Sequence, residues 1–222
     1  MFRPIRRIAS RACLVIATLM LVAPGLDASR EGPMRILLVV DSSSAITSML
    51  NHFRAGLNEF LDAVPENAEV LIVSTGGQLR LRVPATLDRQ KLHDVANGFA
   101  QDGGANSILE TLIEADRRFL QTAPEKWPVI VILSSDSNAS ASTAESRIDA
   151  YNKFMNSFLQ RGGIADAVLV KGRETGVVTD VAINLTSNTG GKYDALATPN
   201  GVPEKLKAAG ERIAAEYKAL HP

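Results

Sequence analysis

A short, uninterrupted apolar segment that ends in a carboxylate constrains the fold of this chain most. Residues 36–40 read Ile-Leu-Leu-Val-Val, and Asp41 and three serines follow directly. An apolar run of this length, rich in branched side chains, is typical of a strand that is buried on both faces, as in a parallel sheet. Open α/β sheets bind ligands at the carboxyl ends of such strands. We therefore expect Asp41 to Ser44 to lie on the functional edge of a sheet.

Strands and helices alternate along the rest of the chain. Strands are predicted over residues 69–74, 128–133, 165–170 and 192–196, and helices over 46–64, 88–99, 108–119, 143–160, 181–188 and 203–220. Gly76-Gly77, followed by alternating apolar and polar residues, predicts a hairpin with an edge strand. We expect Arg80 and Arg82 on that strand to form a solvated face that protects the edge. The order predicts an α/β fold: a mostly parallel, twisted central sheet with one antiparallel edge strand and helices on both faces.

The first 28 residues have the order of a secretory signal peptide. Residues 1–11 are basic, residues 12–23 are apolar, Pro24-Gly25 interrupts the run, and Ala28 offers a small residue for cleavage. The apolar run is shorter than the roughly 20 residues that a membrane span needs, and a retained signal anchor is the alternative. We expect a periplasmic or secreted protein with no stable membrane span after signal removal, and one domain over residues 33–222.

Composition argues against a protein that depends on cysteine and against a protein that binds nucleic acid. The sole cysteine, Cys13, lies within the predicted signal peptide, so the mature chain would have neither a disulfide nor a cysteine nucleophile. The net charge is zero and no basic stripe is present, which argues against a nucleic-acid partner.

Carboxylates and hydroxyl groups follow two of the predicted strands. Asp41 is followed by Ser42 to Ser44, and Asp136 lies among Ser134, Ser135 and Ser137, with the loop Gly103–Ser107 between them in the chain. The ends of parallel strands meet at one edge of a sheet, and these groups are hard oxygen ligands suited to Mg²⁺, Mn²⁺ or Ca²⁺. The alternative is that they only cap helices and terminate strands.

The order of these loops resembles a von Willebrand factor type A (VWA) domain, which carries a metal-ion-dependent adhesion site. The family's first loop reads Asp-x-Ser-x-Ser; Asp41 and Ser43 match it, and Ala45 replaces the second serine. The second loop supplies a threonine, often within Gly-Gly-Thr-Asn, where this chain has Ala105. The third supplies an aspartate, matched by Asp136.

Two further segments resemble the family. Leu87–Arg89 is similar to its Thr-Ser-Asp-Arg segment, and Thr189–Tyr193 is similar to the Thr-Gly-Gly-Arg-Tyr stretch before the last strand. The resemblance covers nearly everything after the signal peptide. It implies a Rossmann-like three-layer fold and a module that binds another protein, with an acidic side chain of the partner completing a metal shell.

The metal site that the resemblance implies is incomplete. Asp41, Ser43 and Asp136 are its ligands, while Ser44, Asn106 and Ser107 are candidates for substitute ligands or partner contacts. Two carboxylates and one hydroxyl group would hold Mg²⁺ or Mn²⁺ weakly; the other outcome is a vestigial site that binds no ion.

Two alternatives compete with a metal-dependent binding module. One is a metal-assisted hydrolase working through Asp41 and Asp136, and the other is a metal-independent scaffold in an envelope complex. The histidines His52, His93 and His221 neighbour no motif, and neither a Gly-x-Ser-x-Gly elbow nor a phosphate-binding glycine loop is present. We therefore expect a binding module and no enzyme.

Overall fold

The computed structural model describes residues 30, 32–136, 145–172 and 176–221. The predicted signal peptide, Ser137 and the start of the predicted helix 143–160 lie outside the described residues. Six strands form one sheet in the order β3-β2-β1-β4-β5-β6, with β3 antiparallel to β2 and the other neighbours parallel. The strands are β1 (Met34–Val40), β2 (Glu69–Ser74), β3 (Arg80–Thr86), β4 (Trp127–Ser135), β5 (Ile164–Val170) and β6 (Tyr193–Leu196). The predicted sheet, including its antiparallel edge strand, is confirmed.

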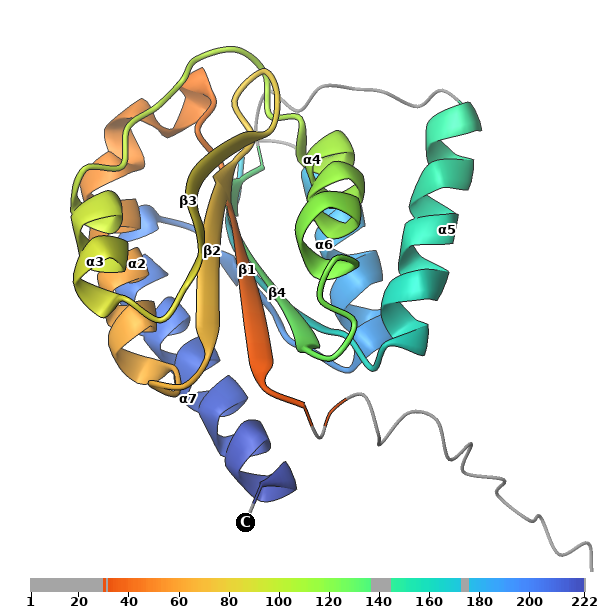
Figure 1. Cartoon of the computed structure of the whole chain (residues 1–222). Helices are drawn as coiled ribbons and strands as arrows, with labels where there is room; N and C mark the ends of the chain where they lie inside the picture. The colour runs from red at the N-terminus through yellow and green to blue at the C-terminus, as the bar shows by residue number, and fades with distance from the viewer. Residues whose placement is uncertain (1–29, 31, 137–144, 173–175, 222) are drawn as a thin grey trace, which may run out of the picture.

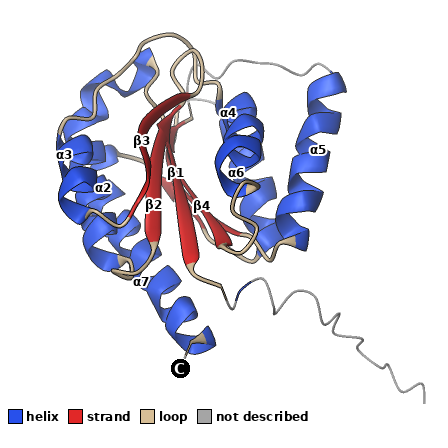
Figure 2. Ribbon diagram, in the orientation of Figure 1, coloured by secondary structure: helices blue, strands red, loops and turns tan. Residues whose placement is uncertain are grey.

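Helices cover both faces of this sheet (Figures 1 and 2). One layer contains α2 (Leu50–Ala63), α3 (Arg89–Asn97) and α7 (Val202–Leu220), and the other contains α4 (Ile108–Ala115), α5 (Glu145–Gln160) and α6 (Val177–Thr189). The described ranges also contain three short helical segments: η1 (Ser44–Met49), η2 (Asp116–Leu120) and η3 (Pro199–Gly201). The result is the predicted three-layer α/β architecture.

Strand β1 divides the core between the two layers. Ile36, Leu38 and Val40 pack into the cluster that contains residues of α2 and α7, whereas Leu37 and Val39 pack into the cluster that contains residues of α4, α5 and α6. Successive side chains of a strand point to opposite faces, so a strand in the middle of a three-layer fold must be apolar throughout. This explains the unbroken apolar run in the sequence.

Two helix boundaries differ from the prediction. Before the helix predicted over residues 46–64, the chain first forms η1, and its N-cap residue, Ser43, makes no side-chain capping bond. The hydroxyl group of the preceding residue, Ser42, donates instead to Asp102 at 2.7 Å. Helix α6 also begins at Val177, earlier than predicted, and ends at Gly190 in the left-handed conformation (φ 75°).

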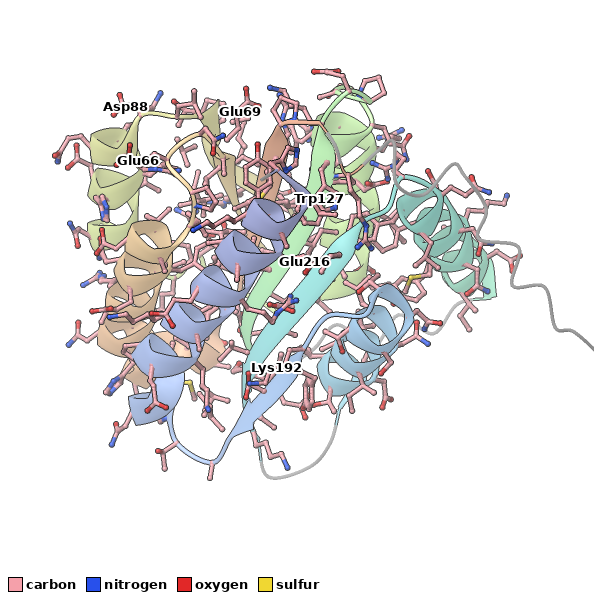
Figure 3. The ribbon with its side chains drawn as sticks, turned by 90° about the horizontal axis from the view of Figure 1, so that it is seen from below. Glu66, Glu69, Asp88, Trp127, Lys192 and Glu216 are labelled. Atoms are coloured by element: carbon pink, nitrogen blue, oxygen red, sulfur yellow. The ribbon has the colours of Figure 1, made fainter. Side chains whose placement is uncertain are left out.

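The first and last described segments of the chain lie close together at the edge of the sheet where the parallel strands begin. Asp41 lies at the other edge, where these strands end. At the edge where they begin, Arg30 pairs with Glu216 of α7 at 3.2 Å, and the ring of Trp127 stacks on Tyr217 with centroids 6.3 Å apart. Figure 3 shows this end from below, with Trp127 and Glu216 near each other. Trp127 is fully buried, so its ring is part of the packed core at this end of the sheet. In the part of the chain described, no helix is long and apolar enough to cross a bilayer.

Candidate functional site

Three loops come together at the carboxyl edge of the sheet. The Asp102 amide donates to the carbonyl of Ser42 at 2.7 Å, which joins the loop after α3 to the end of β1. The amide group of Asn106 donates to Ser134 Oγ at 2.8 Å, and Ser134 Oγ donates to Asp41 Oδ2 at 3.4 Å. The sequence therefore predicted correctly that the segments around Asp41, Asn106 and Ser134 meet in space.

The carboxylate of Asp41 is fully buried and joins β1 to β4. Its Oδ2 accepts from the hydroxyl group of Ser135 at 2.7 Å and from the Ser135 amide at 3.1 Å. Its Oδ1 accepts from the Ser43 amide at 2.8 Å. Hydrogen bonds to the ionised form offset the cost of burying the charge, so Asp41 is stabilised by donors from its own chain.

The carboxylate of Asp136 bonds to the start of α6. It accepts from the Gly176 amide, with the nitrogen 3.1 Å from Oδ2, and from the Thr179 amide at 3.3 Å. The hydroxyl group of Thr179 donates to Oδ2 at 2.6 Å. A negative charge at a helix N-terminus interacts favourably with the helix dipole and with unpaired amides. Asp136 therefore acts as an anchor for α6.

The remaining predicted site residues differ in their accessibility. Ser43 Oγ and Asn106 Oδ1 are buried and have no hydrogen-bond partner in the described part of the chain. Ser107 is buried and begins α4, its amide donating to the Thr75 carbonyl at 3.0 Å. Ser44 is exposed, with its hydroxyl oxygen 3.5 Å from the Gly104 carbonyl. This edge thus has unpaired oxygens beneath an exposed surface of small residues.

These residues do not fit a complete divalent-metal shell. Mg²⁺ prefers six oxygen ligands in a near-octahedral arrangement. Ala45 and Ala105 present methyl groups at two of the motif positions, and Asp41 and Asp136 both accept hydrogen bonds from their own chain. Of the three predicted ligands, Ser43 alone keeps an unbonded side-chain oxygen among the described residues. No group of three or more histidine, cysteine, aspartate or glutamate side chains suited to a metal gathers within that part of the chain.

Asp102 is at the centre of the hydrogen bonds and ion pairs beside this edge, and the sequence pattern did not predict this role. Its side chain is only 5% exposed and accepts from Ser42 Oγ at 2.7 Å and Ser74 Oγ at 2.9 Å. Arg80 donates to Oδ1 at 2.9 Å, and Arg82 pairs with Oδ2. The prediction that both arginines form a solvated face is wrong for Arg82, whose side chain is 23% exposed. In the sequence, Asp102 stands before two glycines and has the pattern of an ordinary turn residue.

The electrostatic balance at Asp102 favours its charged form. Burial acts to raise the pKa of this carboxyl group, but the hydrogen bonds from Ser42 and Ser74 and the positive charges of Arg82 and Arg80 outweigh burial and lower its pKa. Asp102 is therefore ionised at neutral pH and fastens the loop after α3 to β1, β2 and β3.

The histidines make their described contacts away from the three carboxylates. His93 bonds to Asn58 through Nδ1 at 2.6 Å and lies 3.2 Å from Asp62 through Nε2. His221 stacks on Tyr217, with ring centroids 4.1 Å apart, at the amino edge. His52 lies in the first turn of α2. A general base must be within hydrogen-bond reach of the reacting proton, and His93 and His221 occupy other parts of the molecule.

Comparison with known proteins identifies the fold. No protein-family model matches the sequence, and no curated protein matches it significantly. Among solved structures, a von Willebrand factor type A protein from Catenulispora acidiphila superposes with a TM-score of 0.66 at 12% identity, covering 82% of this chain and 43% of that chain. The conserved hypothetical protein BatB from Bacteroides thetaiotaomicron superposes with a TM-score of 0.61 at 13% identity, covering 82% of this chain and 99% of that chain.

A third similar structure contains a metal. Proximal thread matrix protein 1 from the mussel byssus, with a zinc-occupied metal-ion-dependent adhesion site, has a TM-score of 0.60 at 15% identity over 82% of this chain. This chain spans less than half of the C. acidiphila and mussel proteins and nearly all of BatB. At these identities, the likenesses establish the fold.

Proposed function

We propose that this chain, which has a VWA-like fold, is an exported module that binds another protein at the carboxyl edge of its sheet. The observation that carries the proposal is the pair of buried, unpaired oxygens at this edge, Ser43 Oγ and Asn106 Oδ1. In the chain they are next to Ser44 and Ala105, two small residues that are exposed at this edge.

Unpaired buried oxygens favour a ligand or an ordered water at this edge. A buried polar group without a partner costs about 1–3 kcal/mol, so most such groups in proteins are bonded. We propose that an ordered water, or a donor group that a partner brings to this edge, bonds to Ser43 or Asn106 and recovers part of this energy. Protein interfaces commonly include such bridging waters. Binding at this edge is therefore favoured by the chain's own polar groups.

The same contacts support binding over catalysis. A hydrolase needs a nucleophile, a base and an orienting group in mutual contact. Asp41 and Asp136 accept bonds from Ser135 and Thr179 respectively, and these bonds keep both carboxylates in structural roles. We therefore propose that the protein is not an enzyme.

Metal is not required in this proposal. Ala45 and Ala105 supply no ligand oxygen, and both carboxylates already accept hydrogen bonds from the chain. Among the candidate ligands, Ser43 and Asn106 keep a side-chain oxygen without a hydrogen bond in the described structure, and both oxygens are uncharged. Hard divalent cations need charged or numerous oxygen ligands for useful affinity. We propose that a partner binds with these ions absent, in the periplasm or outside the cell, after cleavage of the signal peptide near Ala28.

Site-specific crosslinking in cells that make the protein tests this proposal. The photoreactive residue benzoylphenylalanine replaces Ser44 or Ala105, with an exposed residue at the opposite end, Glu66, as the matched control position (Figure 3). We expect one protein to be captured from positions 44 and 105 and not from 66, and the purified pair to bind equally well with and without EDTA. Capture from 66 to the same extent, or none from either edge position, contradicts the proposal. Mass spectrometry of the exported chain checks the cleavage.

A further inference from the structure

Three guanidinium groups converge on the short segment Phe99–Asp102 beside the candidate site. Arg54 of α2 donates from Nε to the Phe99 carbonyl at 2.8 Å. Arg82 of β3 donates to the Ala100 carbonyl at 3.2 Å and pairs with Asp102. Arg80, also on β3, donates to Asp102 Oδ1 at 2.9 Å. Two elements far apart in the sequence thus bring positive charge to one corner of the molecule.

At the segment Phe99–Asp102, three arginines meet a single carboxylate, which pairs with two of them in the described structure. Asp102 is the one carboxylate that forms an ion pair with any of these three arginines within the described ranges. Its side chain is 5% exposed, so its charge interacts with the arginines and serines that it contacts and little with solvent. Arg82 is fixed by a further bond to Ser74 Oγ at 2.9 Å and lies over the ring of Phe99. Three cations and one buried anion leave an attractive potential for a second anion.

Arg80 is the accessible member of this cluster. Its side chain is 53% exposed, and a single hydrogen bond, to Asp102, is formed in the described structure. A guanidinium group has five N–H donors in a planar fork, so most donors of Arg80 remain available to solvent. The fork matches the two oxygens of a carboxylate, and such paired bonds are stronger than neutral ones.

Arg80 also lies next to the oxygens of the proposed binding edge. Asp102 accepts from Arg80 and from the Ser42 hydroxyl at 2.7 Å, and Ser42 stands between Asp41 and Ser43 in the chain. The amides of Asp102 and Gly103 both donate to the Ser42 carbonyl, at 2.7 and 3.2 Å. One protein surface can therefore contact Arg80 and the edge at Ser44 together.

We infer that Arg80, supported by the charge of Arg54 and held by Asp102, binds an acidic side chain of the partner protein. This inference rests on the proposed function, and it gives the partner's chemistry: an aspartate or glutamate that the guanidinium group recognises directly. The positive charge for that contact comes from the chain itself. Arg82 acts as a positioning residue, because its donors hold the loop and Asp102.

Titration with hexaglutamate peptide, followed by nitrogen-15 NMR of the full mature chain at low salt, tests the inference. We expect shifts in the Arg80 side-chain Nε–H signal and in the amides of Ala100–Asp102. Loss of one charge-assisted contact in Arg80→Gln weakens binding about tenfold. Arg80→Lys retains part of the affinity. The matched control is Arg118→Gln, because Arg118 is also about half exposed and also pairs with one carboxylate, Glu114.

Several outcomes would overturn the inference. Binding lost equally in Arg118→Gln, equal binding of hexaglutamine, or binding abolished by EDTA each contradicts a carboxylate site at Arg80. The partner captured from position 44 separates this inference from the proposed function. If that partner binds Arg80→Gln with unchanged affinity, the inference fails while the binding module stands. If hexaglutamate binds at Arg80 but no protein is captured at the edge, the proposed function fails.

Discussion

The hydroxyl group of Thr179 donates a 2.6 Å hydrogen bond to Oδ2 of Asp136, and this bond joins the end of β4 to the first turn of α6. Asp41, which directly follows β1, bonds to Ser135 on the neighbouring strand β4. The two aspartates of the incomplete motif therefore stabilise two separate junctions of the fold.

Substitution at the Asp136 junction is expected to lower stability. Asp136→Asn removes the charge that accepts three donors at the start of α6, and leaving buried donors unsatisfied costs about 1–3 kcal/mol. Thr179→Val removes one donor and costs about 1 kcal/mol. Urea denaturation measures both. Asp180→Asn, one residue further along on an exposed position, is the control and should change the free energy of unfolding by less than about 0.5 kcal/mol.

Divalent cations are expected to bind weakly at the carboxyl edge. Calorimetric titration of Mg²⁺ and Mn²⁺ into the chelator-treated mature chain should give the same heat of binding for the natural chain and for Asp41→Ala. The reason is that Ala45 and Ala105 supply no ligand oxygen. The Asp41→Ala sample must first show native circular dichroism, since this substitution removes a buried bonding partner of Ser135. Tight binding to the natural chain that disappears in the folded variant would restore a metal-dependent adhesion mechanism.

The stability contribution of Asp102 should depend on pH. Its pKa is lowered in the folded chain, so the contribution is fully present above the unfolded pKa of about 3.9 and is lost as the pH falls through the folded value. At neutral pH, Asp102→Asn leaves Arg82 without its counter-charge and should cost about 3 kcal/mol. The difference between the two proteins should narrow below about pH 4. A pH-independent difference would show that the charge of Asp102 is not what stabilises the loop.

Two adjacent glycines after α6 offer a matched pair of substitutions. A Cβ at Gly191 would lie 1.8 Å from the carbonyl oxygen of Ala165, so Gly191→Ala must displace β5 and should abolish folding or lower the melting temperature severely. Gly190 has φ 75° and open space around the corresponding position, so Gly190→Ala should cost only about 1–2 kcal/mol of backbone strain. Thermal denaturation and soluble yield compare them, and equal effects would contradict the close approach at Gly191.

The sequence predicts those parts of the fold that depend on local pattern. The apolar run of β1 and the Gly76-Gly77 hairpin each have a physical signature within a few residues, and each is confirmed. The resemblance to VWA domains added the correct fold. The convergence of Asp41 with Ser134 followed from parallel topology, because β1 and β4 place their carboxyl ends at one edge.

Side-chain partners at the site depend on contacts between distant segments, which local pattern does not encode. The Asp102 pairs span 20 residues to Arg82 and 60 to Ser42, so neither partner has a periodic or spacing signal. Asp136 matches a metal-ligand motif, yet a helix that begins 41 residues later at Val177 determines which donors reach it. A one-dimensional motif identifies residue types but not which neighbours satisfy them.

The meeting of Arg30 with Glu216 at the amino edge gives the molecule a polarity that is useful to an experimenter. Both described ends of the chain lie at the amino ends of the strands, so a biotin, a reporter domain or a surface attached there extends away from the carboxyl edge. In an array or on a sensor chip, every copy coupled through an end would present the same edge to the solution.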